Sequence, residues 1–265
     1  MRVLVTFALE NEFAPWRSMH RFRSGRLGVS EAYFTELDGV DVTVILTGVG
    51  PARARRETAN VFRDEFDSIN LCVSSGLVGA LRAEYRVGQV LAATAVVSES
   101  LRPDATTQTL ACSGALLSFA QDCGATKVTR FFSADHIVST AKEKDLLASR
   151  ADAVEMESFE VLLAAAESGV PAIAIRSVSD TSGEDLPLDM SQVFNDQGAV
   201  SIPRVLGQVA LHPQSIPGLV RLGKHSRDAA TSLARFLDLY LVALAGKRNQ
   251  SENRSSLVSR QHQAL

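Results

Sequence analysis

Short apolar segments recur along the chain and suit buried β-strands. Each is rich in valine, isoleucine, leucine or alanine, and polar, glycine or proline positions separate it from the next. The segments cover residues 3–8, 42–46, 71–75, 90–97, 127–132 and 172–178. The pattern therefore predicts a set of strands that lie inside the protein.

Between several of these segments, apolar residues recur at spacings of three and four, which is typical of helices with one buried face. The predicted helices cover residues 52–66, 115–122, 141–149 and 158–168. Alternating strands and helices favour an α/β fold with helices on both faces of a sheet. Because the long segment 88–98 and the strand 127–132 are separated by one further helix, we expect strands of mixed direction.

The last part of the chain shows a different pattern. Apolar residues at helical spacing predict a long closing helix over 216–245, with Gly246 as its stop. Residues 247–265 are polar and without periodicity, which predicts a disordered tail. No linker composition interrupts the chain before that point, so residues 1–246 are interpreted as a single catalytic domain.

Composition narrows the class of protein. With 46% hydrophobic and 22% charged residues, the chain resembles an ordinary globular protein. Its net charge of -3 is made of interspersed charges, so nucleic acid and anionic membranes are poor partners and a small molecule is favoured. Three cysteines without CxxC spacing, no signal-peptide pattern and no apolar span predict a cytoplasmic protein without a membrane span.

Acidic residues follow two of the predicted strands. Asp180 closes the apolar segment 172–178, where ligands bind in open α/β sheets, and Glu157 begins the helix before it. Glu12 lies just beyond the first strand. Helix caps and helix N-termini also favour acidic residues, so a structural role is an equal alternative for Asp180 and Glu157. For Glu12 taken alone, the helix dipole is a sufficient explanation.

Two glycine turns follow strands. The turn 47–52 opens a helix but lacks the third glycine of a dinucleotide fingerprint and the lysine of a phosphate-binding loop, so no cofactor is predicted. The turn 74–80 has small residues that let backbone N–H groups approach a ligand, although a plain tight turn is the alternative.

The motifs Glu155-Met156-Glu157 and 176–180, with 75–80 and 8–12 upstream, together resemble the purine nucleoside phosphorylase and nucleosidase superfamily. Within it, the chain is most similar to methylthioadenosine/S-adenosylhomocysteine nucleosidases. The resemblance covers about residues 3–187, and the segment 188–217 is longer than in small bacterial nucleosidases. The resemblance implies a three-layer α/β fold with a mixed, twisted central sheet flanked by helices.

The resemblance also implies a division of roles. Cleavage of a ribose–purine bond passes through an oxocarbenium-like sugar, which calls for an acid at the base and an activated nucleophile. Asp180 would protonate or hydrogen-bond purine N7, and Glu12 would activate water. The implied substrate contacts are Glu155, Met156, Glu157, Arg176, Ser179, Ile137, Val138, Ser75, Gly76, Leu77 and Val78. No metal or cofactor takes part.

Hydrolysis is favoured over phosphorolysis by missing arginines. Related phosphorylases hold phosphate with one arginine before the second glycine turn, where this chain has Ser74, and another in the loop that contains Glu12. Phosphorolysis stays open because Arg17, Arg53 or Arg55 can still reach the site.

Several alternatives remain at this stage. One alternative is a different substrate on the same scaffold, either an adenosyl-lipid, as in hopanoid-associated relatives, or futalosine. Another alternative, outside catalysis, is a nucleoside-binding module without activity. A homodimer is expected, with Trp16 and Phe22 as candidate exposed contact residues.

Overall fold

The computed structural model describes residues 1–64, 69–98, 107–188 and 213–262, with side chains as far as Lys247. Among these residues, ten strands form one sheet in the order β10-β6-β8-β9-β5-β1-β4-β3-β2, with β7 paired to β6. The strands are β1 (Arg2–Phe7), β2 (Arg23–Leu27), β3 (Ser30–Leu37), β4 (Val40–Leu46), β5 (Leu71–Ala80), β6 (Val90–Ser98), β7 (Gln108–Ala111), β8 (Thr126–Ser133), β9 (Ala153–Glu155) and β10 (Ala172–Asp180).

The sheet is mixed, as the sequence predicts. Strand β1 runs parallel to β4 and β5, whereas β3 runs antiparallel to β4. Strand β10 pairs in parallel with β5 and antiparallel with β6. Since β6 also pairs with β8, β8 with β9 and β9 with β5, these five strands close into a ring.

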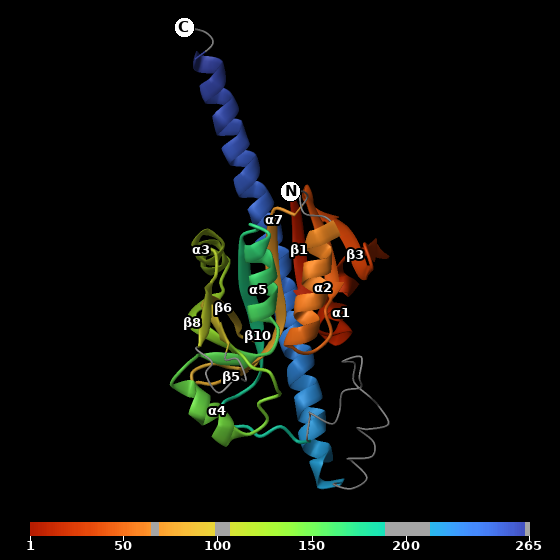
Figure 1. Ribbon diagram of the computed structural model, residues 1–265, viewed down its shortest axis with the longest axis vertical. Helices are drawn as coiled ribbons and strands as arrows, with labels where there is room; N and C mark the ends of the chain where they lie inside the picture. The colour runs from red at the N-terminus through yellow and green to blue at the C-terminus, as the bar shows by residue number, and fades with distance from the viewer. Residues whose placement is uncertain (65–68, 99–106, 189–212, 263–265) are drawn as a thin grey trace.

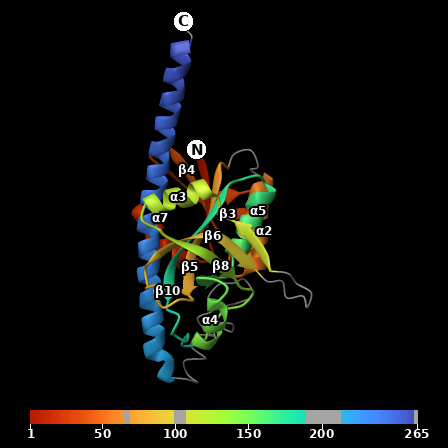
Figure 2. The same cartoon turned by 90° about the vertical axis from the view of Figure 1, so that its left-hand side faces the viewer.

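Helices cover both faces of the sheet, which gives three layers (Figures 1 and 2). On one face α2 packs against α5, and on the other α1 packs against α7, which also contacts β10 and β5. The helices are α1 (Glu10–Met19), α2 (Pro51–Asp64), α3 (Gly114–Asp122), α4 (Ala141–Ala148), α5 (Ser158–Glu167) and α7 (Ile216–His262), with a short 3-10 turn η2 (Pro213–Ser215) before α7.

The predicted strands, and the predicted helices before α7, are confirmed to within a few residues, with one informative exception. The segment 74–80, predicted as a turn, is the second half of β5. Its neighbours β10 and β9 pair with it almost to its end, so strand pairing overrides the turn preference of its glycines. Gly76 keeps a positive φ of 145° inside the strand.

The aromatic residues near the N-terminus form part of the core. Trp16 is fully buried, and its ring lies 6.3 Å from Phe7, 6.4 Å from Phe13 and 5.5 Å from Phe22. Phe22 is partly buried against the same core. The expectation that Trp16 is an exposed contact for a second copy is therefore wrong, because α1 packs it into the core, whereas Phe22 keeps part of its surface exposed.

Helix α7 is longer than predicted. Its residues Leu233, Leu237 and Leu241 are completely buried against the sheet. The helix passes through Gly246 and continues to His262, over most of the predicted tail, while 263–265 lie outside the described residues. A helix already formed by packing can continue through lysine, arginine and glutamine, which are good helix formers.

One part of α7 has the length and composition of a membrane span. It lies within Ile216–Lys247, where the most apolar window of 18 residues has a mean hydropathy of 1.3 and is half buried inside the protein. The same composition is common in helices that pack in a protein core, so this finding is weak evidence for a membrane.

Candidate functional site

A pocket of about 220 Å³ lies where β1, β5, β9 and β10 end or bend. Helix α7 closes one side of it with Leu222 and Ser226. Its described lining comprises Ala8, Leu9, Glu12, Val49, Leu77, Val78, Gly79, His136, Ile137, Val138, Val154, Glu155, Met156, Glu157, Arg176, Ser179, Asp180, Leu186, Leu222 and Ser226. Charged groups and aliphatic side chains thus share one cavity, as a site for an amphipathic small molecule requires.

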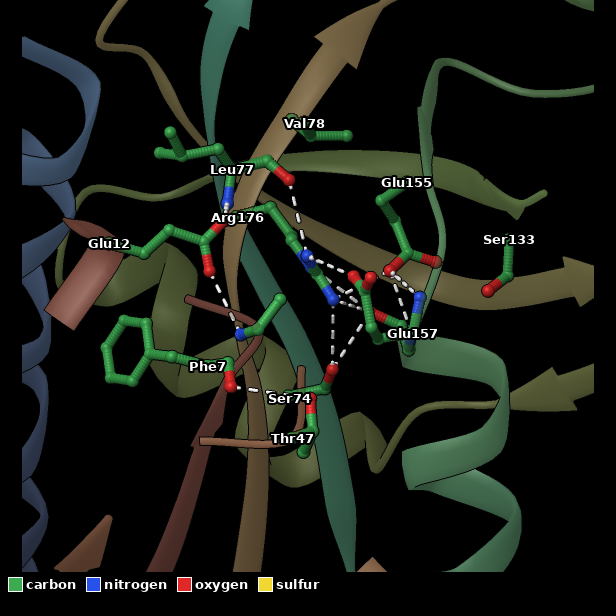
Figure 3. Close-up of polar contacts among 12 residues, drawn as sticks. Phe7, Glu12, Thr47, Ser74, Leu77, Val78, Ser133, Glu155, Glu157 and Arg176 are labelled. Carbon is green, nitrogen blue, oxygen red and sulfur yellow. Dashed lines mark hydrogen bonds and ion pairs between the residues drawn. The ribbon is translucent and has the colours of Figure 1, made fainter. Parts of the chain in front are cut away.

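Arg176 lies at the floor of the pocket and is only 1% exposed. Its guanidinium contacts Glu155 Oε2 at 2.6 Å and Glu157 Oε2 at 3.2 Å (Figure 3). It also donates to the hydroxyl of Ser158 and to the carbonyl of Leu77. A buried guanidinium with this many acceptors is fully satisfied and holds the surrounding carboxylates in place.

Glu155 has a structural position beneath the site. Its Oε2 accepts backbone N–H groups of Glu157 at 2.9 Å and Ser158 at 2.7 Å, at the start of α5. A carboxylate is favoured there by the free N–H groups of the first helical turn. Glu155 therefore fixes the end of β9 to α5 and, through Arg176, to β10.

Glu157 faces the pocket from the N-terminal end of α5. Its Oε1 accepts the backbone N–H of Gly50 at 3.0 Å, and its Oε2 contacts Arg176. Burial raises the pKa of Glu157 to about 7, against the opposing effect of Arg176, with Glu155 and Glu12 adding like-charge repulsion. Near neutral pH this group exists in both the charged and the neutral form.

Glu12 reaches the same cavity from the first turn of α1. Its Oε2 accepts the N–H groups of Ala8 at 3.0 Å and Leu9 at 3.1 Å, and its Oε1 accepts that of Leu77 at 3.2 Å. Burial raises its pKa, while Arg176 and these backbone bonds lower it. The carboxylate is held rigidly, and it keeps lone-pair capacity for one more donor.

The glycine in the middle of β5 makes room for this arrangement. A Cβ on Gly76 would lie 2.8 Å from Arg176 Nη1 and 3.1 Å from Glu12 Oε2. Together with its positive φ, this means that no other residue fits without displacing a charged group of the site.

Asp180 is the last residue of β10. Its Oδ1 accepts the Ser179 hydroxyl at 2.7 Å, and its Oδ2 contacts the ammonium of Lys144 at 2.5 Å. The side chain is 13% exposed and belongs to the pocket lining. Both oxygens are thus oriented by protein donors, with an edge of the carboxylate open to the cavity.

The opposite wall comes from the loop between β8 and α4. Ile137 and Val138 line the pocket, and His136 lies at its edge. The ring of His136 bonds Asp135 at 2.7 Å and Glu143 at 2.6 Å, and these bonds raise its pKa. His136 therefore ties the loop to α4.

Most of the predicted site residues come together in this cavity. Glu12, Glu155, Met156, Glu157, Arg176, Ser179, Asp180, Ile137, Val138, Leu77 and Val78 all belong to its described lining. Ser75 and Gly76 do not, because the strand buries Ser75 and Gly76 carries no side chain.

Sequence patterns missed three residues that matter to the site. Lys144 contacts Asp180, Gly50 donates to Glu157 and Ser158 accepts from Arg176. Ser158 directly follows the Glu155-Met156-Glu157 motif, and Gly50 lies in the first glycine turn, so sequence motifs next to both residues could have indicated them. Lys144 lies in no such motif.

This fold and site define a class. The family model described as Phosphorylase superfamily matches residues 2–209, and the chain belongs to this superfamily. A comparison with curated proteins gives no match.

Solved structures of nucleosidases share the fold. A futalosine hydrolase mutant of Helicobacter pylori has 17% identity and a TM-score of 0.70, and the match covers 91% of this chain and 98% of that one. A 5′-methylthioadenosine/S-adenosylhomocysteine nucleosidase of Neisseria meningitidis has 20% identity and a TM-score of 0.69, with coverage of 91% and 99%. A Helicobacter pylori nucleosidase mutant with 5′-methylthioadenosine in its active site has 18% identity and a TM-score of 0.69, with coverage of 91% and 97%.

Proposed function

We propose that this protein hydrolyses the N-glycosidic bond of an adenine nucleoside of the methylthioadenosine or S-adenosylhomocysteine type. The observation that carries the proposal is the convergence of Glu12, Glu157 and Asp180 on one pocket. Each carboxylate comes from a different element and each is held by protein donors. The nucleosidase folds named above, one of them with 5′-methylthioadenosine bound, support the same substrate class.

In this proposal the purine ring lies between Asp180 and the aliphatic wall of Ile137 and Val138. Asp180 holds the proton at N7, which makes the base a better leaving group. As the C1′–N9 bond breaks, its electron pair moves to N9 and the sugar gains positive charge. Carboxylates near the sugar stabilise that charge electrostatically.

Glu12 and Glu157 act on the sugar side. Glu12 accepts a proton from a water molecule whose oxygen bonds to C1′, and its raised pKa suits a base that works near neutral pH. Glu157 accepts hydrogen bonds from the ribose hydroxyls, beside Met156. Arg176 orients Glu157, and Ser179 orients Asp180, without contacting the reacting atoms.

Water is favoured over phosphate as the nucleophile. Within the described lining, Arg176 is the one arginine, and its guanidinium is occupied by Glu155, Glu157 and Ser158. Two other candidates are paired on the surface, Arg17 with Glu10 and Arg55 with Glu167. The carboxylates of Glu12 and Glu157 beside the sugar also disfavour a phosphate dianion there.

One experiment tests the reaction class. The protein is incubated with methylthioadenosine, S-adenosylhomocysteine, adenosine and inosine, with and without phosphate, and the sugar product is identified by chromatography. Free sugar in the absence of phosphate is expected, and a sugar 1-phosphate formed only with phosphate overturns hydrolysis. Adding futalosine and an adenosyl-lipid tests the two alternative substrates. Protection against thermal unfolding by a nucleoside that is not cleaved favours a binding module.

Substitutions test the assigned roles. Asp180→Asn and Glu12→Gln are each expected to lower kcat by about 10²–10⁴-fold, the usual contribution of a general acid or base. Asp145→Asn, which changes an exposed residue of α4, is the matched control. Full activity of Asp180→Asn on any cleaved substrate removes the role given to Asp180.

The proposal includes a homodimer in the cytoplasm. Its support is general, since closed homo-oligomers are the commonest assemblies of soluble enzymes. Light scattering after size-exclusion chromatography measures the assembly, and a monomeric mass contradicts this part.

A further inference from the structure

Two buried serines contact the arginine in the floor of the pocket, and the proposed reaction gives them no role. Ser74 lies in β5, and Ser158 is the first residue of α5. Both are completely buried, and we call them the serine pair. The Ser158 hydroxyl accepts hydrogen bonds from Nε of Arg176 at 3.2 Å and from Nη2 at 3.1 Å. One hydroxyl oxygen thus holds one whole edge of the guanidinium.

The two hydroxyls of the serine pair are bonded to each other at 3.0 Å. A hydroxyl has one donor and two acceptor sites. Because two N–H groups of Arg176 occupy both acceptor sites of Ser158, its own hydrogen is directed at Ser74. Ser74 Oγ also lies 3.4 Å from Arg176 Nη2, as a second and longer acceptor. Two elements whose serines are 84 residues apart in the sequence therefore hold one edge of the arginine together.

The remaining donors of Arg176 point to the carboxylates and the backbone of the site. Its Nη1 donates to the carbonyl of Leu77 and to Glu157 Oε2, each at 3.2 Å, and its Nη2 contacts Glu155 Oε2 at 2.6 Å (Figure 3). A guanidinium is rigid and planar, with its five N–H donors in fixed directions. The edge that Ser158 holds therefore sets the direction from which Nη1 meets Glu157.

Glu157 depends on this contact more than Glu12 does. Among the described residues, the Glu157 carboxylate accepts one other hydrogen bond, from the N–H of Gly50 at 3.0 Å. Glu12 is held by three backbone N–H groups of its surroundings. A shift of the guanidinium is therefore expected to turn Glu157 and to leave Glu12 in place.

Burial of a serine does not by itself create such a network. Ser75 and Ser177 are the next residues along the same two strands and are also buried. Within the described part of the chain, their hydroxyls have no hydrogen-bond partner. Since side chains alternate along a strand, these two lie on the face of the sheet opposite to Arg176. The bonded serines are those on the face that carries the site.

We propose that the serine pair acts through Arg176 to position Glu157 for the ribose hydroxyls, and that it thereby makes the protein prefer ribonucleosides to deoxyribonucleosides. The inference rests on the proposed function, because it takes Glu157 as the acceptor of those hydroxyls. The serines are positioning residues, since they contact neither the base nor the sugar. Their effect falls on the sugar contact, while Asp180 is oriented separately by Ser179.

The preference between substrates with and without a ribose hydroxyl tests the inference. Steady-state kinetics gives kcat/KM for 5′-methylthioadenosine and for its 2′-deoxy and 3′-deoxy forms. The wild type is expected to prefer the ribonucleoside by about 10–100-fold over at least one deoxy form, the effect of one hydrogen bond to a charged group. Ser158→Ala is expected to lower this preference by about fivefold or more, because the carboxylate is displaced from the hydroxyl. Ser74→Ala is expected to change it in the same direction by a smaller factor.

A matched control separates positioning from general damage to the core. Ser177→Ala removes a buried hydroxyl next to Arg176 that has no partner among the described residues, and it is expected to keep the wild-type preference. Differences in the intrinsic reactivity of the substrates cancel, because every variant is measured on the same three.

Three results overturn the inference. In the first, Ser158→Ala slows all three substrates by the same factor, as a merely structural role requires. In the second, Ser177→Ala loses as much preference as Ser158→Ala. If Ser158→Ala does not fold, Ser74→Ala decides by the same criterion. In the third, the wild type itself shows no preference for the ribonucleoside.

The same measurements distinguish this inference from the proposed function. Hydrolysis of 5′-methylthioadenosine and of its deoxy forms at equal rates by the wild type contradicts the role of the serine pair and leaves the proposed function intact. A wild type that cleaves none of the adenine nucleosides loses the proposed function, and the inference with it.

Discussion

At the scale of single residues, the site is governed by one buried arginine among three buried glutamates. Arg176 compensates only part of their charge, and burial disfavours what remains. The raised pKa values of Glu12 and Glu157 follow from this imbalance. Near neutral pH, Glu157 in the floor of the pocket is therefore still partly protonated, whereas an ordinary glutamate is ionised.

This arrangement makes stability depend on pH in a definite direction. Glu157 has a folded-state pKa of about 7, above its ordinary value of 4.5. Its contribution to the free energy of unfolding is fully present below about 4.5 and is lost as the pH rises through about 7. We expect Glu157→Gln to flatten the fall of unfolding free energy over this range, as measured by urea denaturation. Glu31→Gln, at an exposed position, is expected to leave the slope unchanged, and equal slopes for both variants contradict the assignment.

A second residue-scale prediction concerns Gly76. We expect Gly76→Ala to cost about 1–3 kcal/mol from backbone strain, and to lose activity because its methyl group displaces Arg176 or Glu12. Gly124→Ala is the control, since Gly124 also has a positive φ but a methyl group added there would meet no atom within 4 Å. Similar activity in the two variants means that the contact at Gly76 has no functional effect.

Sequence patterns predict some of the residues of the site and miss others. Glu157, Arg176 and Asp180 were predictable because they lie in one continuous stretch in which an apolar strand follows an acidic motif. The contact between Lys144 and Asp180 joins α4 to the end of β10, which lie 36 residues apart in the sequence. No local pattern encodes such a contact, and a lysine in a short helix is usually solvated.

At the scale of elements, the strands that are buried on both faces of the sheet were the ones that the sequence pattern predicted. β1, β5 and β10 are nearly continuous apolar runs, and their positions follow from that pattern. β2 was not predicted, because four of its five residues are exposed. Its place in the sheet comes from pairing with β3 alone.

Helix α1 joins the site to the core, and its packing can be tested. Phe13 is fully buried, with ring contacts to Phe7, Trp16 and Phe22. We expect Phe13→Ala to lower the free energy of unfolding by about 3–5 kcal/mol, as for other large buried side chains. Met19→Ala, at an exposed position of the same helix, is the control. A loss below about 1 kcal/mol for Phe13→Ala contradicts the observed packing.

At the scale of the whole molecule, α7 is the longest element and packs along the sheet (Figure 2). Of the α7 residues whose side chains are described, the buried ones lie between Ala229 and Ala245. We expect a chain that ends after Lys247 to keep its melting temperature and activity, since the core contacts remain. A chain that ends after Asp228 is expected not to fold, because it exposes the face of the sheet that α7 covers. Circular dichroism measures the folding of both truncated chains, and the nucleoside assay measures their activity. Loss of folding in the chain that ends after Lys247 contradicts the expectation that the core contacts of α7 end before that residue.

The ring of five strands restricts how this protein can move. Strand β10 carries Arg176 and Asp180 and is hydrogen-bonded on both sides, to β5 and to β6. Its amide hydrogens can exchange with solvent only when the ring opens, which involves most of the molecule. The strand that carries Arg176 and Asp180 is therefore expected to be the slowest-exchanging wall of the pocket, and native-state hydrogen exchange measures this.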